Sequence, residues 1–321
     1  MPRRSWLIVA FAIVSIVWGS TYLGIRVALE SYPPFLLGAL RFLLAGAVLV
    51  VVARVRGEAM PSRREWGSAA VTGVLFFVIG NGLVNVAEAT VSSGLASVLV
   101  ATMPLWMTVF GRLFGATATP REIAGVVLGL SGVLILNLGG DLRASPAGAL
   151  VCLLAPLGWS LGSLASQRMP LPAGMMRTAT QMLTGGAAML LVSFALHEPP
   201  ATPTLRTTLA VGYLCVFGSL IGFTAYSYLL RHTRPAVASS YAYVNPVIAV
   251  VLGIAMAGEK FGVQSGVGAL VVLAAVALVQ KRGPVRVPPA EPGREPEVEG
   301  PSDLAPATSM VLCKMTPSHT I

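Results

Sequence analysis

Long apolar runs, separated by short polar or proline-containing segments, make up most of the chain. A helix that crosses the hydrocarbon of a bilayer needs about 20 mostly apolar residues. Ten windows of this kind lie at roughly 6–25, 34–53, 67–87, 93–111, 123–139, 147–165, 175–196, 208–230, 235–257 and 262–280. Strands of a membrane barrel would instead alternate over segments of ~10 residues. The sequence therefore predicts an all-α, polytopic membrane protein with ten transmembrane helices.

The sequence also repeats itself once. Trp18 in IVWGSTYLGIR matches Trp159 in LGWSLGSLASQR, and SGLASVLVATMP (93–104) matches PAVASSYAYVNP (235–246). Each half holds five windows, and because five is odd the second half enters the membrane in the opposite sense. Inverted repeats of this kind are typical of secondary transporters, whose sites lie near the midplane between the halves. We divide the chain into a first five-helix repeat at 1–140, a second at 146–282 and a tail at 283–321.

Composition and charge agree with a membrane protein. Only 11% of the residues are charged and the mean hydropathy is +0.77, whereas a soluble domain carries about 25% charged residues. The formal net charge of +9 would suggest a nucleic-acid partner in a soluble protein. With a cytoplasmic N-terminus, however, 15 basic residues lie inside and 4 outside. The positive-inside rule thus predicts a membrane protein with both termini cytoplasmic, and the positive charge does not indicate a nucleic-acid partner.

The sequence lacks the motifs of several other classes of protein. It has no GxxxxGK[ST] loop for ATP and no clustered Asp and His residues for metal-dependent chemistry. No Asp or Glu lies at the centre of a predicted span, where a proton relay usually has a carboxylate or a histidine. We therefore expect no catalytic residues, no cofactor and no metal. The tail is rich in Pro and Glu and is predicted to be a disordered cytoplasmic segment.

Two prolines stand at the same repeat position inside predicted spans. Pro104 and Pro246 each lie near the centre of a window. A proline frees the carbonyl four residues earlier, and in hydrocarbon such a carbonyl is tolerated only against protein or a water-filled cavity. Paired breaks in the two halves point to a binding site. A packing kink without substrate contact is the alternative interpretation.

Arg41 is a charge about seven residues into the second window. A charge at this depth is costly and usually faces the interior of the bundle. Its guanidinium could hold a substrate carboxylate, or it could be a structural tie to carbonyls or to a carboxylate such as Glu88. Trp18 and Trp159 are also deep, and either present aromatic faces to a solute or pack tightly against small neighbours.

Other polar and aromatic residues complete the candidate site. Asn81 and Asn85 are four residues apart and share a helix face, where they either line a polar path or bond to neighbouring helices. The predicted substrate-binding residues are Trp18, Thr21, Arg41, Asn81, Asn85, Thr102, Pro104, Trp106, Trp159, Tyr226, Tyr241, Tyr243, Asn245 and Pro246. This mixture suits a small amphipathic, zwitterionic or anionic solute.

Several motifs resemble one family of transporters. WGSTYLGIR (18–26) followed by PPFLLGALRFLLAG (33–46), and ASVLVATMP (96–104) with AVASSYAYVNP (236–246), are similar to the EamA family of the drug/metabolite transporter superfamily. The resemblance implies a ten-helix, two-repeat bacterial inner-membrane carrier, often an exporter of amino acids or other small metabolites. Unlike the small multidrug relatives, this chain has no acidic residue in the middle of its first span. The alternative function is a non-transporting scaffold or sensor that acts through the tail.

Overall fold

The computed structural model describes residues 4–91, 93–113, 119–137, 145–257 and 263–280, which are helical apart from their turns. The helices are α1 (Arg4–Ala28), α2 (Pro34–Val55), α3 (Arg63–Gly73), η1 (Val74–Gly82), α4 (Leu83–Glu88), α5 (Ser93–Val100), α6 (Met103–Leu113), α7 (Pro120–Asn137), α8 (Pro146–Ser166), α9 (Met176–Ala195), α10 (Leu205–Tyr213), η2 (Leu214–Ile221), α11 (Gly222–His232), α12 (Pro235–Ser239), α13 (Tyr241–Ala257) and α14 (Val263–Gln280).

Within the described residues, helices lie in each of the ten predicted windows, so the all-helical fold class is confirmed. In the same part of the chain, six helices are long and apolar enough to cross a membrane. The third span is the continuous run of α3, η1 and α4, and the eighth is that of α10, η2 and α11. The fourth and ninth spans are each divided, into α5 and α6 and into α12 and α13. The predicted tail at 283–321 lies outside the described residues.

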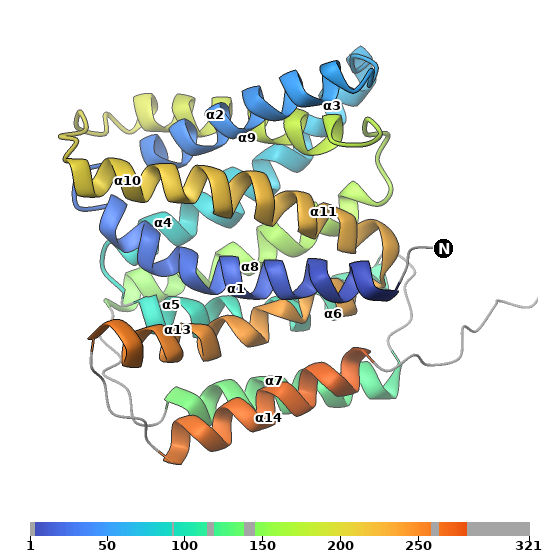
Figure 1. Cartoon of the computed structure of the whole chain (residues 1–321), viewed down its shortest axis with the longest axis vertical. Helices are drawn as coiled ribbons and strands as arrows, with labels where there is room; N and C mark the ends of the chain where they lie inside the picture. Colours follow the sequence, from blue (N-terminus) through green and yellow to red (C-terminus); the bar gives the residue numbers. More distant parts are fainter. Residues whose placement is uncertain (1–3, 92, 114–118, 138–144, 258–262, 281–321) are drawn as a thin grey trace, which may run out of the picture. The chain divides into compact units, whose positions relative to one another are not determined.

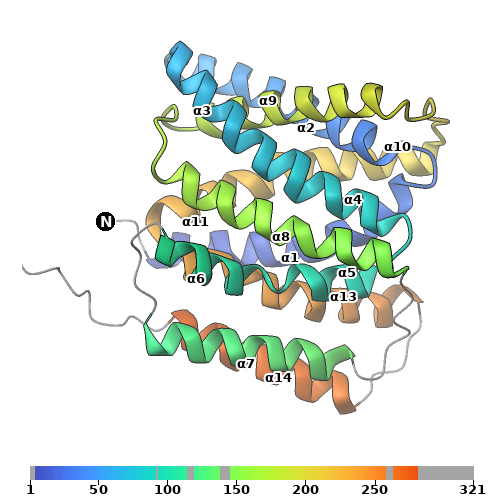
Figure 2. The same ribbon diagram turned by 180° about the vertical axis from the view of Figure 1, so that it is seen from behind.

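Within residues 1–283 the helices lie side by side. Figures 1 and 2 show α2, α3 and α9 at one edge, α1 and α8 near the middle, and α7 paired with α14 at the other edge. The pairs α2 with α9 and α7 with α14 each join one helix from either half of the sequence. We call the side at which α1 begins the N side and the side at which α2 begins the far side.

The third and eighth spans each contain a π-helical segment at a corresponding place. The segments are η1 and η2, and in η1 the Asn81 side chain donates a hydrogen bond of 3.0 Å to the carbonyl of Phe76, five residues earlier. π-Bulges are rare in proteins, and those that occur are often at functional sites. No pattern in the sequence predicts these segments.

The divided fourth and ninth spans place their prolines differently. In the fourth span α5 ends at Val100 and Pro104 is the second residue of α6, where a missing N–H costs little. In the ninth span the turn is at Ser240, and α13 continues through Pro246 as a helix. Both spans therefore have a break before the proline, but the breaks fall at different distances from it.

Two carboxylates join α2 to α9 at both ends. On the N side, Glu58 follows α2 and accepts hydrogen bonds of 3.0 and 2.8 Å from the backbone N–H groups of Met175 and Met176, where α9 begins. On the far side, Glu198 follows α9 and accepts bonds of 3.0 and 2.9 Å from Phe35 and Leu36, where α2 begins. Each carboxylate thus satisfies unpaired N–H groups at a helix N-terminus and faces the positive end of its dipole.

The backbone around these carboxylates is also alike in the two halves. Gly57 and His197 come directly before the two glutamates and have φ angles of 80° and 53°, in the left-handed region. Between the caps the helix contact is reciprocal, because a Cβ on Gly46 would meet Leu183 and a Cβ on Gly186 would meet Leu43. One helix of each repeat is therefore held against its counterpart along its length.

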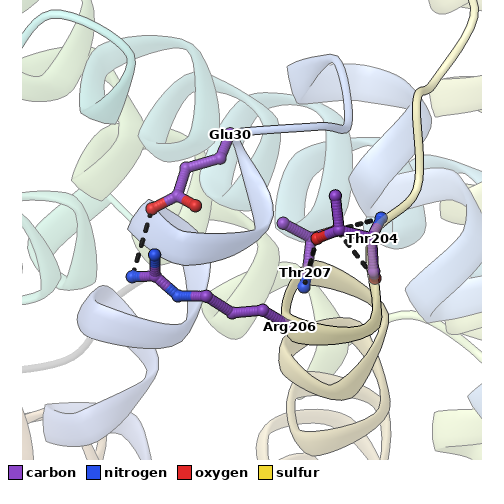
Figure 3. A network of polar contacts seen from close by, with 4 residues as sticks. All are labelled: Glu30, Thr204, Arg206 and Thr207. Carbon is purple, nitrogen blue, oxygen red and sulfur yellow. Dashed lines mark hydrogen bonds and ion pairs between the residues drawn. The ribbon is translucent and has the colours of Figure 1, made fainter.

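A third carboxylate makes only an exposed contact. Figure 3 shows Glu30, at the far end of α1, paired with Arg206 in α10 at 3.3 Å, beside the Thr204–Thr207 capping box. The two charged side chains are 47% and 68% exposed. Exposed ion pairs contribute about 0–1 kcal/mol, so Glu30 offers a control for the two capping glutamates.

We predict that Glu58→Gln and Glu198→Gln each lower the stability of the protein by about 1.5–3 kcal/mol, the usual range for a hydrogen bond to a charged group. The amide that replaces the carboxylate has one acceptor oxygen for two N–H donors. Thermal unfolding of the purified protein in detergent measures the effect, with Glu30→Gln as the matched control. Losses no larger than that of the control would contradict the capping role.

Candidate substrate cavity

A small cavity lies at the centre of the described helices. Its volume is about 60 Å³, and side chains from both halves line it. The lining residues are Trp18, Thr21, Tyr22, Ile25, Arg41, Gly80, Asn81, Val84, Val100, Met103, Ala155, Pro156, Trp159, Tyr241 and Asn245. This volume is far below the roughly 300–1,000 Å³ of typical ligand pockets. A metabolite can occupy it only if the surrounding helices move apart.

Arg41 brings a positive charge into this cavity. Its side chain is 3% exposed, and its Nε donates a hydrogen bond of 2.7 Å to Ser219 in η2. Its Cζ lies 4.8 Å from the ring centroid of Phe42. Among the described residues no carboxylate lies within ion-pair distance of Arg41, and its two Nη atoms have no hydrogen-bond partner there. A buried charge in this state is costly and can accept an anionic partner.

The two repeat-related tryptophans meet beside Arg41. The rings of Trp18 and Trp159 contact each other edge to face, with centroids 5.1 Å apart. Trp18 donates from Nε1 to the carbonyl of Gly218 in η2 at 2.9 Å, and a Cβ on Gly222 would collide with its ring. In the other half, a Cβ on Gly80 would lie 2.9 Å from the ring of Trp159. Each tryptophan therefore packs on a glycine of the opposite half, in or directly after its π segment.

An aromatic cluster continues from Trp18 towards the N side. The centroids of Phe223, Tyr226 and Tyr241 lie 5.0, 5.3 and 4.9 Å from that of Trp18. The Tyr226 hydroxyl is hydrogen-bonded to Ser163 at 2.7 Å. Aromatic pairs in such tilted or edge-to-face arrangements contribute about 0.5–1.5 kcal/mol beyond the area they bury. The cluster gives the cavity a rigid apolar wall.

Polar atoms without partners lie among the lining residues. The Nε1 of Trp159 and the Oδ1 of Asn245 are buried and have no hydrogen-bond partner in the described part of the chain. Tyr22 faces the Asn245 side chain, and the Thr21 hydroxyl donates to the carbonyl of Trp18 at 2.7 Å. An unpaired buried polar atom costs about 1–3 kcal/mol. A bound solute with matching groups would remove that cost.

Seven of the fourteen predicted site residues line the cavity: Trp18, Thr21, Arg41, Asn81, Trp159, Tyr241 and Asn245. Tyr226 lies in the aromatic cluster, and Pro104 and Pro246 lie in α6 and α13 without lining the cavity. The structure thus brings the seven lining residues together around one cavity, and their role in binding a solute stays a prediction.

The other predicted site residues make contacts away from the cavity. Asn85 donates to the carbonyl of Pro34 at 3.0 Å, and Thr102 donates to that of Leu99 at 2.7 Å. Trp106 stacks on Phe110 with centroids 5.7 Å apart. The Tyr243 ring packs against Gly129, so closely that a Cβ added to this glycine would lie 2.9 Å from ring atoms. These contacts tie helices or local turns together.

Eight of the residues that line the cavity were not among the predicted site residues, and they include Tyr22 and Pro156. Tyr22 stands four residues after Trp18, about one helical turn away, and therefore shares its helix face. Pro156 stands inside α8, and the first half has no proline at the matching position. The best sequence signal for the cavity wall is the pair of glycines at 80 and 222. They stand 142 residues apart and therefore occupy the same position in the two halves.

Comparison with known proteins identifies the family. The sequence matches the EamA-like transporter family over residues 5–138 and again over 146–280. The chain belongs to the EamA-like transporter family. The predicted resemblance to this family, within the drug/metabolite transporter superfamily, is confirmed.

Several relatives of this EamA-like chain are named transporters. "Uncharacterized inner membrane transporter YedA" of Escherichia coli K12 is 44% identical over 266 residues, which cover 82% of this chain and 87% of the relative. "Uncharacterized transporter YdfC" of Bacillus subtilis 168 is 30% identical over 267 residues, with coverages of 81% and 86%. "Probable terminal-alkyne amino-acid exporter" of Streptantibioticus cattleyicolor is 26% identical over 277 residues, with coverages of 85% and 93%.

A solved structure shares the fold. A crystal structure with 22% sequence identity superposes with a TM-score of 0.71, over 86% of this chain and 97% of the other. At this identity the similarity concerns the fold alone. Together with the family and the apolar helices, it describes a multi-pass transporter of the inner membrane.

We predict that Gly222→Ala and Gly80→Ala each destabilise the protein by about 1–3 kcal/mol, the usual cost of overpacking a core. The added methyl group displaces the ring of Trp18 or Trp159. Thermal unfolding and tryptophan fluorescence report the change. Gly212→Ala in α10 is the control, because a Cβ there meets nothing within 4 Å. Variants at 80 and 222 that behave like this control would contradict the described packing.

Proposed function

We propose that this EamA-like protein is a secondary exporter of amino acids or other small amphipathic metabolites. One observation carries the proposal: the Arg41 side chain is buried without a carboxylate partner among the described residues, and it lines a cavity formed by both repeats. Anionic groups suit guanidinium because its N–H donors match carboxylate geometry. The similarity to a protein named as a probable terminal-alkyne amino-acid exporter is compatible with this class of solute.

The unpaired atoms around the cavity support a zwitterionic solute. In our proposal a carboxylate accepts hydrogen bonds from the Nη atoms of Arg41 and from Nε1 of Trp159, and an ammonium group donates to Oδ1 of Asn245. The apolar part of the solute then contacts the ring of Trp18 and the aromatic wall. This arrangement gives hydrogen-bond partners to Nε1 of Trp159 and Oδ1 of Asn245, which are otherwise buried without them.

The orientation in the membrane follows from charge. We propose that the N side is cytoplasmic, since that choice leaves 15 basic residues inside and 4 outside. The aromatic cluster then lies between the cavity and the cytoplasm, and Glu198 lies on the outer side.

Transport would proceed by alternating access between the two inverted repeats. The capped α2–α9 pair restricts how this can happen, because it holds one helix of each repeat against the other at both ends. The repeats therefore cannot swing apart as two rigid blocks. We infer that the spans that line the cavity move around a stationary α2–α9 pair, and that the π segments and the breaks at 101–102 and Ser240 absorb the bending.

The transport hypothesis is tested first by finding the solute. Untargeted metabolite comparison of cells with and without the protein nominates solutes, and counterflow in proteoliposomes that contain the purified protein then measures saturable flux. We predict that Arg41→Gln lowers flux by about tenfold or more, because a lost hydrogen bond to a charged group costs about 1.5–3 kcal/mol.

The control for Arg41 is Arg206→Gln, which removes a positive charge that is 68% exposed. It should keep the wild-type flux, and both variants must reach the membrane at wild-type levels. Wild-type protein without saturable flux for any nominated solute would contradict the carrier function. Equal flux in Arg41→Gln and wild type would contradict the site.

The stationary α2–α9 pair is tested by cross-linking. In a protein without its native cysteines, a disulfide between Gly46→Cys and Leu183→Cys joins α2 to α9, whose contact there is close. We predict that this disulfide leaves flux intact. A disulfide between Gly19→Cys and Ile248→Cys, which joins the cavity-lining spans α1 and α13, should block flux reversibly. Loss of flux with the first disulfide would contradict the inferred motion.

A further inference from the structure

Glu88 is a buried carboxyl group that neither the cavity nor the helix caps use. It is the last residue of α4, at the far end of the third span, and its exposure is 0%. Its Oε1 has no hydrogen-bond partner in the described part of the chain, and its Oε2 lies 3.5 Å from the hydroxyl of Ser93. A carboxylate normally accepts several bonds, so this group lacks most of the partners that an ionised form requires.

The nearest cation is occupied elsewhere. Arg26 in α1 donates from Nη1 to the backbone carbonyl of Glu88 at 2.9 Å and to that of Val91 at 3.4 Å. Within the described ranges Glu88 has no ion pair. The guanidinium is thus close enough to influence the carboxyl group, but its hydrogen bonds go to main-chain oxygens.

The other groups around Glu88 do not favour a negative charge. Tyr22 faces it from α1 and Cys152 from α8, and Ser93 comes from α5. Arg26 is the positively charged group among these neighbours. Burying an ionised carboxylate without a paired charge costs several kcal/mol. The geometry therefore fits the protonated acid in this conformation.

Glu88 also lies between two spaces. On the far side it lines an open vestibule of about 620 Å³, together with Arg26, Glu30, Glu198 and the 31–34 turn. On the other side Tyr22, its neighbour, lines the central cavity next to Asn245. The Glu88 side chain is nevertheless fully buried, so a proton can reach water in the vestibule only after neighbouring side chains such as Arg26 or Tyr22 move.

We propose that Glu88 is a proton-binding site that couples solute transport to the proton gradient. In the step we infer, Arg26 turns from the carbonyls to the carboxyl group, the O–H bond of Glu88 breaks, and the proton passes to vestibule water. The reverse rotation favours reprotonation. This inference rests on the proposed carrier function and adds an energy source to it. An intramembrane ionisable residue without a partner is a functional site by default.

The protonated group can be tested without a solute. Infrared difference spectra of the full-length protein in lipid, recorded between pH steps, should contain the carbonyl stretch of a buried protonated carboxyl group. The band should be absent in Glu88→Gln and unchanged in Glu30→Gln, whose side chain is exposed. Absence of the band from the wild type, or its persistence in Glu88→Gln, would overturn the assignment. Thermal unfolding checks that the variants fold.

The coupling is tested in proteoliposomes with a solute nominated by the metabolite comparison. A pH gradient should stimulate wild-type flux, and Glu88→Gln should lose this stimulation. Glu65→Gln, which changes a carboxyl group at the opposite end of the third span, should keep it. Saturable flux that ignores the pH gradient, or that responds to a sodium gradient instead, would overturn the coupling and leave the carrier function standing. Absence of flux from the wild type in every condition would reject the carrier function itself.

Discussion

The two carboxylates that cap α2 and α9 constrain the rest of the molecule. Because Glu58 and Glu198 each bind the N-terminus of the other repeat's helix, the two halves are joined at both sides of the bundle. The close glycine–leucine contacts between these caps make the pair a single packed unit. Arg41 projects from this unit into the cavity, so a charge that must be held in place stands on an element tied at both ends.

Irregular backbone is concentrated where the cavity lies. In a membrane, non-helical backbone is tolerated only against protein or a water-filled space. The two π segments and the turn at 101–102 occur in spans that supply the cavity or pack on its tryptophans, whereas α2 and α9 are regular throughout. Trp18 and Trp159 lie against glycines in or directly after these segments. The bulky rings fit there because glycine has no side chain. The irregular segments thus lie beside the cavity, together with the continuous helices α1 and α8.

Much of the fold could be predicted, because apolar runs show the length of each span and matching motifs show the repeat. The high free energy of a charge in hydrocarbon indicated that Arg41 faces the bundle interior. The matching repeat positions of Trp18 and Trp159 indicated that these two residues belong together. The π segments have no residue signature, so no pattern indicated them. The caps join residues more than 100 positions apart, which local periodicity does not reveal. Glu88 stands at the end of the third span, where a carboxyl group is ordinarily solvated, and only packing shows that it is buried.

In the proposed mechanism, a solute occupies the space between Arg41 and the paired tryptophans. The most direct measurement is an experimental structure of the protein in lipid with its transported solute bound. The account predicts that an anionic group of the solute lies within hydrogen-bond distance of the Nη atoms of Arg41, in a cavity wider than the 60 Å³ of the present conformation. A solute bound outside this cavity, with Arg41 still bonded only to Ser219, would contradict it.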